Sequence, residues 1–126
     1  MTIGYITLGA LDVEGELPFY DSVLGAVDYA RTALEDGSAF YGKAGAADIG
    51  ICKPFDGQPA RGGNGIMIAF KTDTQDQVKT AYDAALAHGG SDEGPPGFRP
   101  PAATSGFYGA YFRDAAGNKY CVYVNL

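Results

Sequence analysis

The sequence predicts an α+β protein built from two related modules, because two amphipathic helical stretches each follow one β-like run and precede others. The order strand, helix, strands therefore occurs twice. A shift of the chain by 62 residues also superposes identical residues of the two halves: Ile6 on Ile68, Tyr20 on Tyr82, Asp21 on Asp83 and Leu24 on Leu86. Each half is too small to bury its own sheet, so we expect the two to pack as one domain.

The first half begins with a predicted strand over residues 3–9, which holds three β-branched residues and has Ile6 and Leu8 on one face. A helix is expected over residues 12–25, because apolar residues recur at spacings of four, three and four from Val13 to Leu24, and Gly25 can end it. Three short strands are expected to follow, over residues 27–32, 38–43 and 47–53.

The second half follows a Gly- and Pro-rich loop over residues 54–65. A strand is expected over residues 66–71, then a helix over 73–88 with Val78, Tyr82 and Leu86 on its apolar face and Gly89 as its left-handed cap. Residues 90–105 hold four of the seven prolines and predict a loop. Strands over 106–113 and 118–125 close the chain. Module one thus spans about residues 1–54, the linker about 55–64 and module two about 65–126.

The composition argues against several kinds of partner. The chain has 126 residues and a formal net charge of −6, and its nine Lys and Arg are scattered singly, so it lacks the basic face that nucleic acid requires. Its apolar stretches are far shorter than a bilayer span, which argues against a membrane. The N-terminus carries no targeting pattern and two cysteines cannot form a disulfide framework, so we expect a cytoplasmic protein with reduced thiols.

Alternation along the strands predicts a binding pocket. In each strand one face is strongly apolar and suits packing under a helix, whereas the other face mixes polar and apolar side chains. If residues 106–113 and 118–125 form a hairpin, Tyr111 lies opposite Cys121 and joins this mixed face. The candidate ligand-binding residues are Tyr5, Met67, Tyr111, Cys121 and Tyr123, with Arg99 in the neighbouring loop able to hold a carboxylate. The alternative is that these side chains simply fill the space against one another.

Three segments together resemble one known superfamily. Residues 5–9 followed by 19–25 (YITLG and FYDSVLG), residues 63–70 (GNGIMIAF), and residues 107–114 followed by 117–119 (FYGAYFRD and GNK) are similar to the vicinal oxygen chelate superfamily. That group contains glyoxalase I, bleomycin-resistance proteins, fosfomycin-resistance proteins and extradiol dioxygenases. The resemblance implies two βαβββ modules whose mixed sheets curve into a cup, with the helices outside. It also implies a homodimer, because in many members the two modules of a cup come from partner chains.

The metal site that the resemblance implies is altered in this sequence. Metal-dependent members line the cup with two His and one Glu, and these positions fall on Tyr5, Met67 and Cys121. The only acid in residues 47–53 is Asp48, and the only histidine is His88. A phenol, a thioether and a thiol are poor ligands for the hard and borderline cations of this superfamily. We therefore expect no metal and no other cofactor.

The resulting functional prediction is a glyoxalase- or bleomycin-resistance-like protein that binds a small, partly apolar organic ligand without a metal. One alternative is a lyase or isomerase that acts on a small oxygenated metabolite, with Tyr5 or Tyr111 as the polar catalytic group. A second alternative is a non-catalytic protein with a collapsed cup that associates with a partner. Cys121 as a nucleophile is disfavoured, because no histidine lies near it in sequence to activate the thiol.

Overall fold

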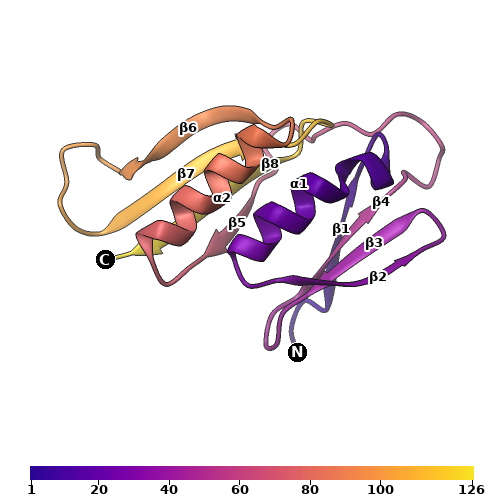
Figure 1. Cartoon of the computed structure of the whole chain (residues 1–126), viewed down its shortest axis with the longest axis horizontal. Coiled ribbons are helices and arrows are strands. Elements are labelled where there is room, and N and C mark those ends of the chain that lie inside the picture. The colour runs from indigo at the N-terminus through magenta and orange to yellow at the C-terminus, as the bar shows by residue number, and fades with distance from the viewer.

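The computed structural model describes all 126 residues and contains two helices and eight strands in two βαβββ modules (Figure 1). This confirms the predicted fold class. The elements of the first module are β1 (Tyr5–Gly9), α1 (Val13–Ala26), β2 (Ala30–Glu35), β3 (Ser38–Gly42) and β4 (Asp48–Cys52). Those of the second are β5 (Ile68–Lys71), α2 (Gln75–Ala87), β6 (Ser91–Phe98), β7 (Phe107–Arg113) and β8 (Lys119–Asn125).

Each module forms its own mixed four-stranded sheet with the same topology. The strand orders are β1-β4-β3-β2 and β5-β8-β7-β6, and in both sheets the first strand runs parallel to the last while the other pairs are antiparallel. The helices keep the 62-residue repeat, because α1 begins at residue 13 and α2 at residue 75. The two modules are therefore structural copies of one another, as the sequence repeat indicated.

The helices lie side by side on one face of the molecule, and α1 packs against α2 (Figure 1). No strand of one sheet packs over the other sheet. We call the face of each sheet that points away from the helices its outer face. Within a single chain, no helix or strand covers either outer face, which leaves the mixed strand faces open. Neither helix is long and apolar enough to cross a membrane.

The prediction of a loop over residues 90–105 is wrong for its first half, where β6 lies. The prolines that suggested a loop are tolerated because β6 is the edge strand of its sheet and needs hydrogen bonds on one side only. Its pairing with β7 is interrupted twice, on either side of Gly94. These irregularities are typical of edge strands, and they also removed the alternation that would have identified this strand from the sequence.

Two further boundaries differ from the prediction. Helix α1 continues through Gly25 to Ala26, and Asp28 takes the left-handed conformation with φ of 68° in the turn that follows. Strand β2 therefore begins at Ala30 rather than at residue 27. In α2, the predicted apolar face is only partly correct, because Val78 is buried but Leu86 is 39% exposed. Small residues, Ala81 and Ala85, complete the buried face instead, and Gly89 caps the helix at φ of 90° as predicted.

A buried polar network joins the two modules. The hydroxyl of Tyr20 on α1 donates to Oδ2 of Asp114 in the β7–β8 turn, and it also lies 2.6 Å from the hydroxyl of Tyr120 on β8. The side-chain amide of Asn118 donates to the same carboxylate at 2.8 Å and to the carbonyl of Gly9 on β1 at 2.9 Å. Burial, together with the neighbouring Asp114 charge, raises the pKa of both tyrosines, so they remain neutral hydrogen-bond donors.

Candidate functional site on the open sheet faces

The outer face of the second sheet brings together several predicted site residues. Tyr111 on β7 lies directly opposite Cys121 on β8, as the sequence predicted, and Cys121 also pairs with Ala69 on β5. Tyr123 lies opposite Gly109 and shares this face, because it is two residues from Cys121. The Cys121 thiol is only 2% exposed, and burial raises its pKa, although Tyr111, Arg99 and Lys119 act in the opposite direction. It is therefore a poor nucleophile at neutral pH.

Arg99 folds back from the end of β6 onto this outer face. Its guanidinium donates to the carbonyl of Pro95 at 2.8 Å and to that of Phe98 at 3.2 Å. Gly94 and Gly97 make room for it, since a Cβ at either position would come within 3.3 Å of a guanidinium nitrogen. The glycines of this edge strand thus serve to place a cation on the sheet.

The ring of Tyr111 is the centre of the site. The guanidinium carbon of Arg99 lies 5.7 Å from the ring centroid, and the ammonium nitrogen of Lys119 lies 5.8 Å from it, both within the range of cation–π attraction. We call Arg99, Tyr111, Lys119 and Cys121 the Tyr111 cluster. Burial, followed by the neighbouring Cys121, raises the pKa of the Tyr111 phenol, so the hydroxyl remains protonated at neutral pH. The cluster thus offers a hydroxyl, an aromatic ring and two cations in a chain of net charge −6.

An aromatic pair extends the wall of the site. Phe107 stacks on Tyr123 with ring centroids 5.0 Å apart and an interplanar angle of 16°. A Cβ at Gly109 would come 2.7 Å from the Phe107 ring, so the absence of a side chain there allows the stack to lie flat on the sheet. Sequence reasoning missed Phe107 as a member of this wall, although it alternates with Tyr111 along β7 and could have been found from that spacing.

Tyr5 and Met67 occupy matching places in the two modules and remain exposed. Tyr5 begins β1, Met67 directly precedes β5, and the two are related by the 62-residue repeat. Their exposed fractions are 68% and 44%, whereas aromatic and thioether side chains are usually covered. Tyr5 lies on the first sheet and so is separate from the Tyr111 cluster on the second sheet. The structure therefore joins Arg99, Tyr111 and Cys121 directly, and does not join Tyr5 to them within one chain.

The cavity of this chain lies elsewhere. It has a volume of about 820 Å³ and is formed by the ends of β1 and β4 together with the linker that follows β4. None of the six predicted ligand-binding residues lines it. Their binding role remains a prediction that concerns the open sheet faces rather than an enclosed pocket in one chain.

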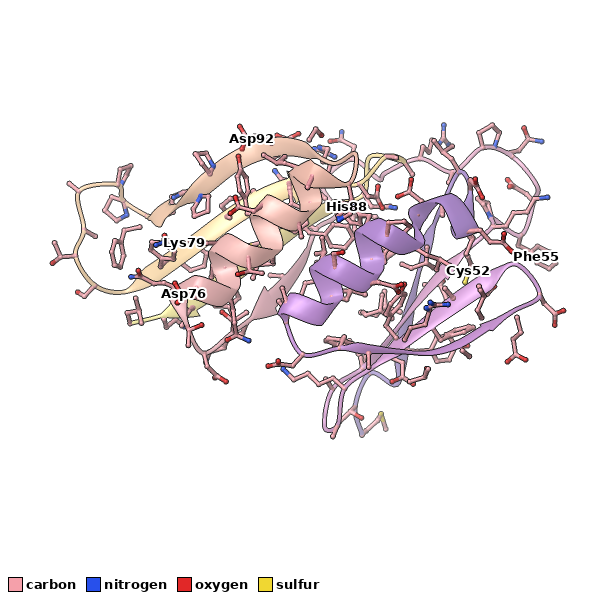
Figure 2. All side chains as sticks on the ribbon, in the orientation of Figure 1. Cys52, Phe55, Asp76, Lys79, His88 and Asp92 are labelled. Carbon is pink, nitrogen blue, oxygen red and sulfur yellow. The ribbon has the colours of Figure 1, made fainter.

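The donors in the chain do not suit a metal ion. No group of three or more His, Cys, Asp or Glu side chains comes together in a way that could hold one. His88 lies at the end of α2, between the two helices (Figure 2), where Nε2 is 3.3 Å from the hydroxyl of Ser22. Asp48 lies at the exposed start of β4. The positions that correspond to the superfamily's metal ligands carry the phenol of Tyr5, the thioether of Met67 and a buried, protonated thiol.

The paired βαβββ modules with mixed sheets define the fold class of this chain. The sequence profile of the glyoxalase/bleomycin resistance protein/dioxygenase superfamily matches residues 2–122, and the chain belongs to this superfamily. No curated protein matches the chain significantly.

Solved structures show the same fold. A glyoxalase/bleomycin resistance protein from Albidiferax ferrireducens T118 is 35% identical with a TM-score of 0.87, and the match covers 98% of both chains. A glyoxalase-related enzyme from Fulvimarina pelagi is 22% identical with a TM-score of 0.76, over 99% of this chain and 88% of that one. The fosfomycin resistance protein FosX from Mesorhizobium loti is 16% identical with a TM-score of 0.68, over 99% of this chain and 92% of that one. The last two support the fold alone.

Proposed function

We propose that this protein binds a small, partly apolar organic ligand that carries an anionic group, and that it does so without a metal ion. The observation that carries the proposal is the Tyr111 cluster, where an aromatic ring with a protonated hydroxyl lies 5.7 Å from one cation and 5.8 Å from another on an open sheet face. Arg99 and Lys119 would hold the anionic group, and the Phe107–Tyr123 stack would cover the apolar part of the ligand.

The Tyr111 hydroxyl is better suited to ligand binding than to proton abstraction. A phenol whose pKa is raised by burial does not lose its proton near neutral pH, so it donates a hydrogen bond rather than acting as a base. The lyase or isomerase alternative would need another base, and the other phenols among the predicted site residues are those of Tyr5 and Tyr123. Sequestration of a ligand needs none of these proton transfers.

We further propose that the cup is completed by a second copy of the chain. The outer faces are uncovered, and the exposed apolar residues Tyr5 and Met67 occur at the same place in both modules. A two-fold dimer would place the first module of one chain over the second module of its partner, and would bury both residues. Such a homodimer would contain two equivalent sites. We expect it to act in the cytoplasm with both thiols reduced.

A thermal-shift screen tests the proposed function. Small organic acids and matched neutral compounds would be added to the protein in the presence of chelator, and separately with divalent metals. A ligand of the native state raises the melting temperature by mass action. We expect anionic, partly apolar compounds to raise it equally with and without metal, and elemental analysis to find no stoichiometric metal. Stabilisation that requires a divalent ion would contradict the proposal.

A further inference from the structure

The cavity beside the linker is a second candidate site, separate from the Tyr111 cluster. All of its lining residues lie between Thr7 and Arg61, so it belongs to the first module and the linker of one chain. Its volume of about 820 Å³ falls within the range of about 300–1,000 Å³ that is common for small-molecule sites. Figure 2 shows two of its residues, Cys52 and Phe55, at the end of the first module, far from Lys79 on α2.

The walls of this cavity are held by close backbone contacts. A Cβ at Gly9 would come 2.9 Å from the Cβ of Ala60, so the linker packs directly on the end of β1. The amide of Ala10 donates to the carbonyl of Cys52 at 2.9 Å, which fixes the ends of β1 and β4 together. The amide of Gly62 donates to the carbonyl of Ala116 at 3.0 Å and ties the linker to the β7–β8 turn. These contacts fix the backbone of the inner wall before any ligand arrives, while the side chains of Lys53, Phe55 and Arg61 are exposed at its rim.

The side chains that line the cavity are more positive than the chain as a whole. Lys53 and Arg61 both line it, and neither forms an ion pair, since the two ion pairs of the chain are Arg31–Asp21 and Arg113–Glu93. The single acid of the lining, Asp56, already accepts a hydrogen bond from the amide of Gln58 at 3.0 Å. The cavity thus carries a net positive charge in a protein of net charge −6.

The neutral part of the lining is suited to an apolar group. Leu8, Pro54, Pro59 and Ala60 contribute aliphatic surface, and the side chain of Phe55 is fully exposed beside them. An apolar ligand group that covers the exposed Phe55 ring would remove apolar surface from water, which favours binding. We propose that this cavity binds a small organic anion, a carboxylate or a phosphate ester, through Lys53 and Arg61, with its apolar part against the prolines and Phe55.

Cys52 provides a direct readout, because it lines the cavity and is half-buried, whereas Cys121 is buried. The alkylation rate of Cys52 by iodoacetamide would be followed by peptide mass spectrometry while benzoate, phenyl phosphate or neutral benzyl alcohol is added. We expect saturable protection by one or both anions and none by benzyl alcohol. The anion that protects at the lower concentration identifies the preferred group. Equal protection by benzyl alcohol, or no protection by either anion, would overturn the proposal.

Variants distinguish this cavity from the Tyr111 cluster. Lys53→Ala and Arg61→Ala should each raise the half-protective anion concentration by about three- to tenfold, because each removes one charge contact. The matched control Lys79→Ala removes the same charge from exposed α2 and should leave it unchanged. If Tyr111→Phe weakens protection and Arg61→Ala does not, the anion binds at the cluster and the present proposal fails. Weaker protection in Arg61→Ala together with unchanged protection in Tyr111→Phe supports binding in the cavity. That result does not depend on whether the Tyr111 cluster binds a ligand of its own.

Discussion

Asp114 is a buried carboxylate without a cationic partner. It is 5% exposed, and three donors solvate it instead: the Tyr20 hydroxyl and the backbone and side-chain amides of Asn118. A buried charge is tolerated only when hydrogen bonds replace the lost water. Tyr20 lies in the first module and Asp114 in the second. The Asp114 carboxylate therefore has all of its hydrogen-bond donors only when the two modules pack together.

Removing the Tyr20 hydroxyl should therefore be costly. We expect Tyr20→Phe to lower the free energy of unfolding by about 1–3 kcal/mol, because it leaves the buried Asp114 carboxylate short of a donor. Tyr82, its counterpart in the repeat, donates to Asp92 at 3.0 Å in an exposed setting. Tyr82→Phe should cost less than about 0.5 kcal/mol, since water replaces the lost bond. Urea unfolding compares the two, and equal losses would contradict the proposed role of the network.

Glu16 should make stability depend on pH. Burial raises its pKa above the ordinary value of 4.5, and the nearby charges of Asp114 and Asp12 raise it further. The folded protein therefore binds this proton more tightly than the unfolded chain, and stability is lost as the pH rises through the folded pKa. We expect Glu16→Gln to be more stable than the wild type near neutral pH, with the difference vanishing near about pH 4 and below.

The control for this prediction is Glu14→Gln, which removes an exposed acid from the same first turn of α1. Both substitutions lose a favourable interaction with the helix dipole, so their difference isolates the effect of burial and of Asp114. Unfolding measured across the pH range gives the comparison. A Glu16→Gln protein that is less stable than Glu14→Gln near neutral pH would refute the pKa argument.

At the scale of elements, the packing of the buried face of α2 depends on small residues. Ala81 and Ala85 are fully buried, while the larger Leu86 points outward. Ala85→Leu should lower the free energy of unfolding by about 1–3 kcal/mol, because added atoms overpack this face. Ala87→Leu adds the same volume at an exposed position of the same helix and should change stability by less than about 0.5 kcal/mol. Thermal unfolding of both variants tests this, and equal effects would mean that the face is not closely packed.

Sequence periodicity predicted the elements best where one face is buried and the strand is regular. The hairpin β7–β8 was predicted with the correct pairing of Tyr111 and Cys121, because strict alternation specifies a register. Strand β6 was missed because its prolines and bulges break that alternation. Leu86 was placed on the buried face of α2 because large apolar residues define the helical pattern, whereas the small residues Ala81 and Ala85 complete that face in the structure.

The candidate site was predictable only in part, for a physical reason. Alternation identifies which residues share a face, so Tyr111, Cys121 and Tyr123 could be grouped from the sequence. It does not indicate that the guanidinium of Arg99 turns back over Gly94, since this depends on the path of an irregular edge strand. The linker cavity was missed for the same reason, because it is formed by loop residues that have no periodicity.

For the whole molecule, the open sheet faces predict self-association. We expect a sedimentation mass of about twice the chain mass of 13.1 kDa at micromolar concentration. Met67→Asp should convert the dimer to a folded monomer, because it places a charge in the proposed interface. Leu86→Asp replaces a residue of similar exposure on α2, 39% against 44%, and should leave the dimer intact. A wild-type protein that sediments as one chain would contradict the shared cup.

The Tyr111 cluster is proposed to bind an organic anion without a metal. Calorimetric titration of the strongest ligand from the screen, in the presence of chelator, measures this binding. We expect binding by the wild type, a loss of about 0.5–1.5 kcal/mol of binding free energy in Tyr111→Phe, and no change in the control Tyr82→Phe, which removes the same hydroxyl from a half-buried tyrosine on α2. Binding that appears only after a divalent metal is restored, or that is identical in Tyr111→Phe and the wild type, would contradict it.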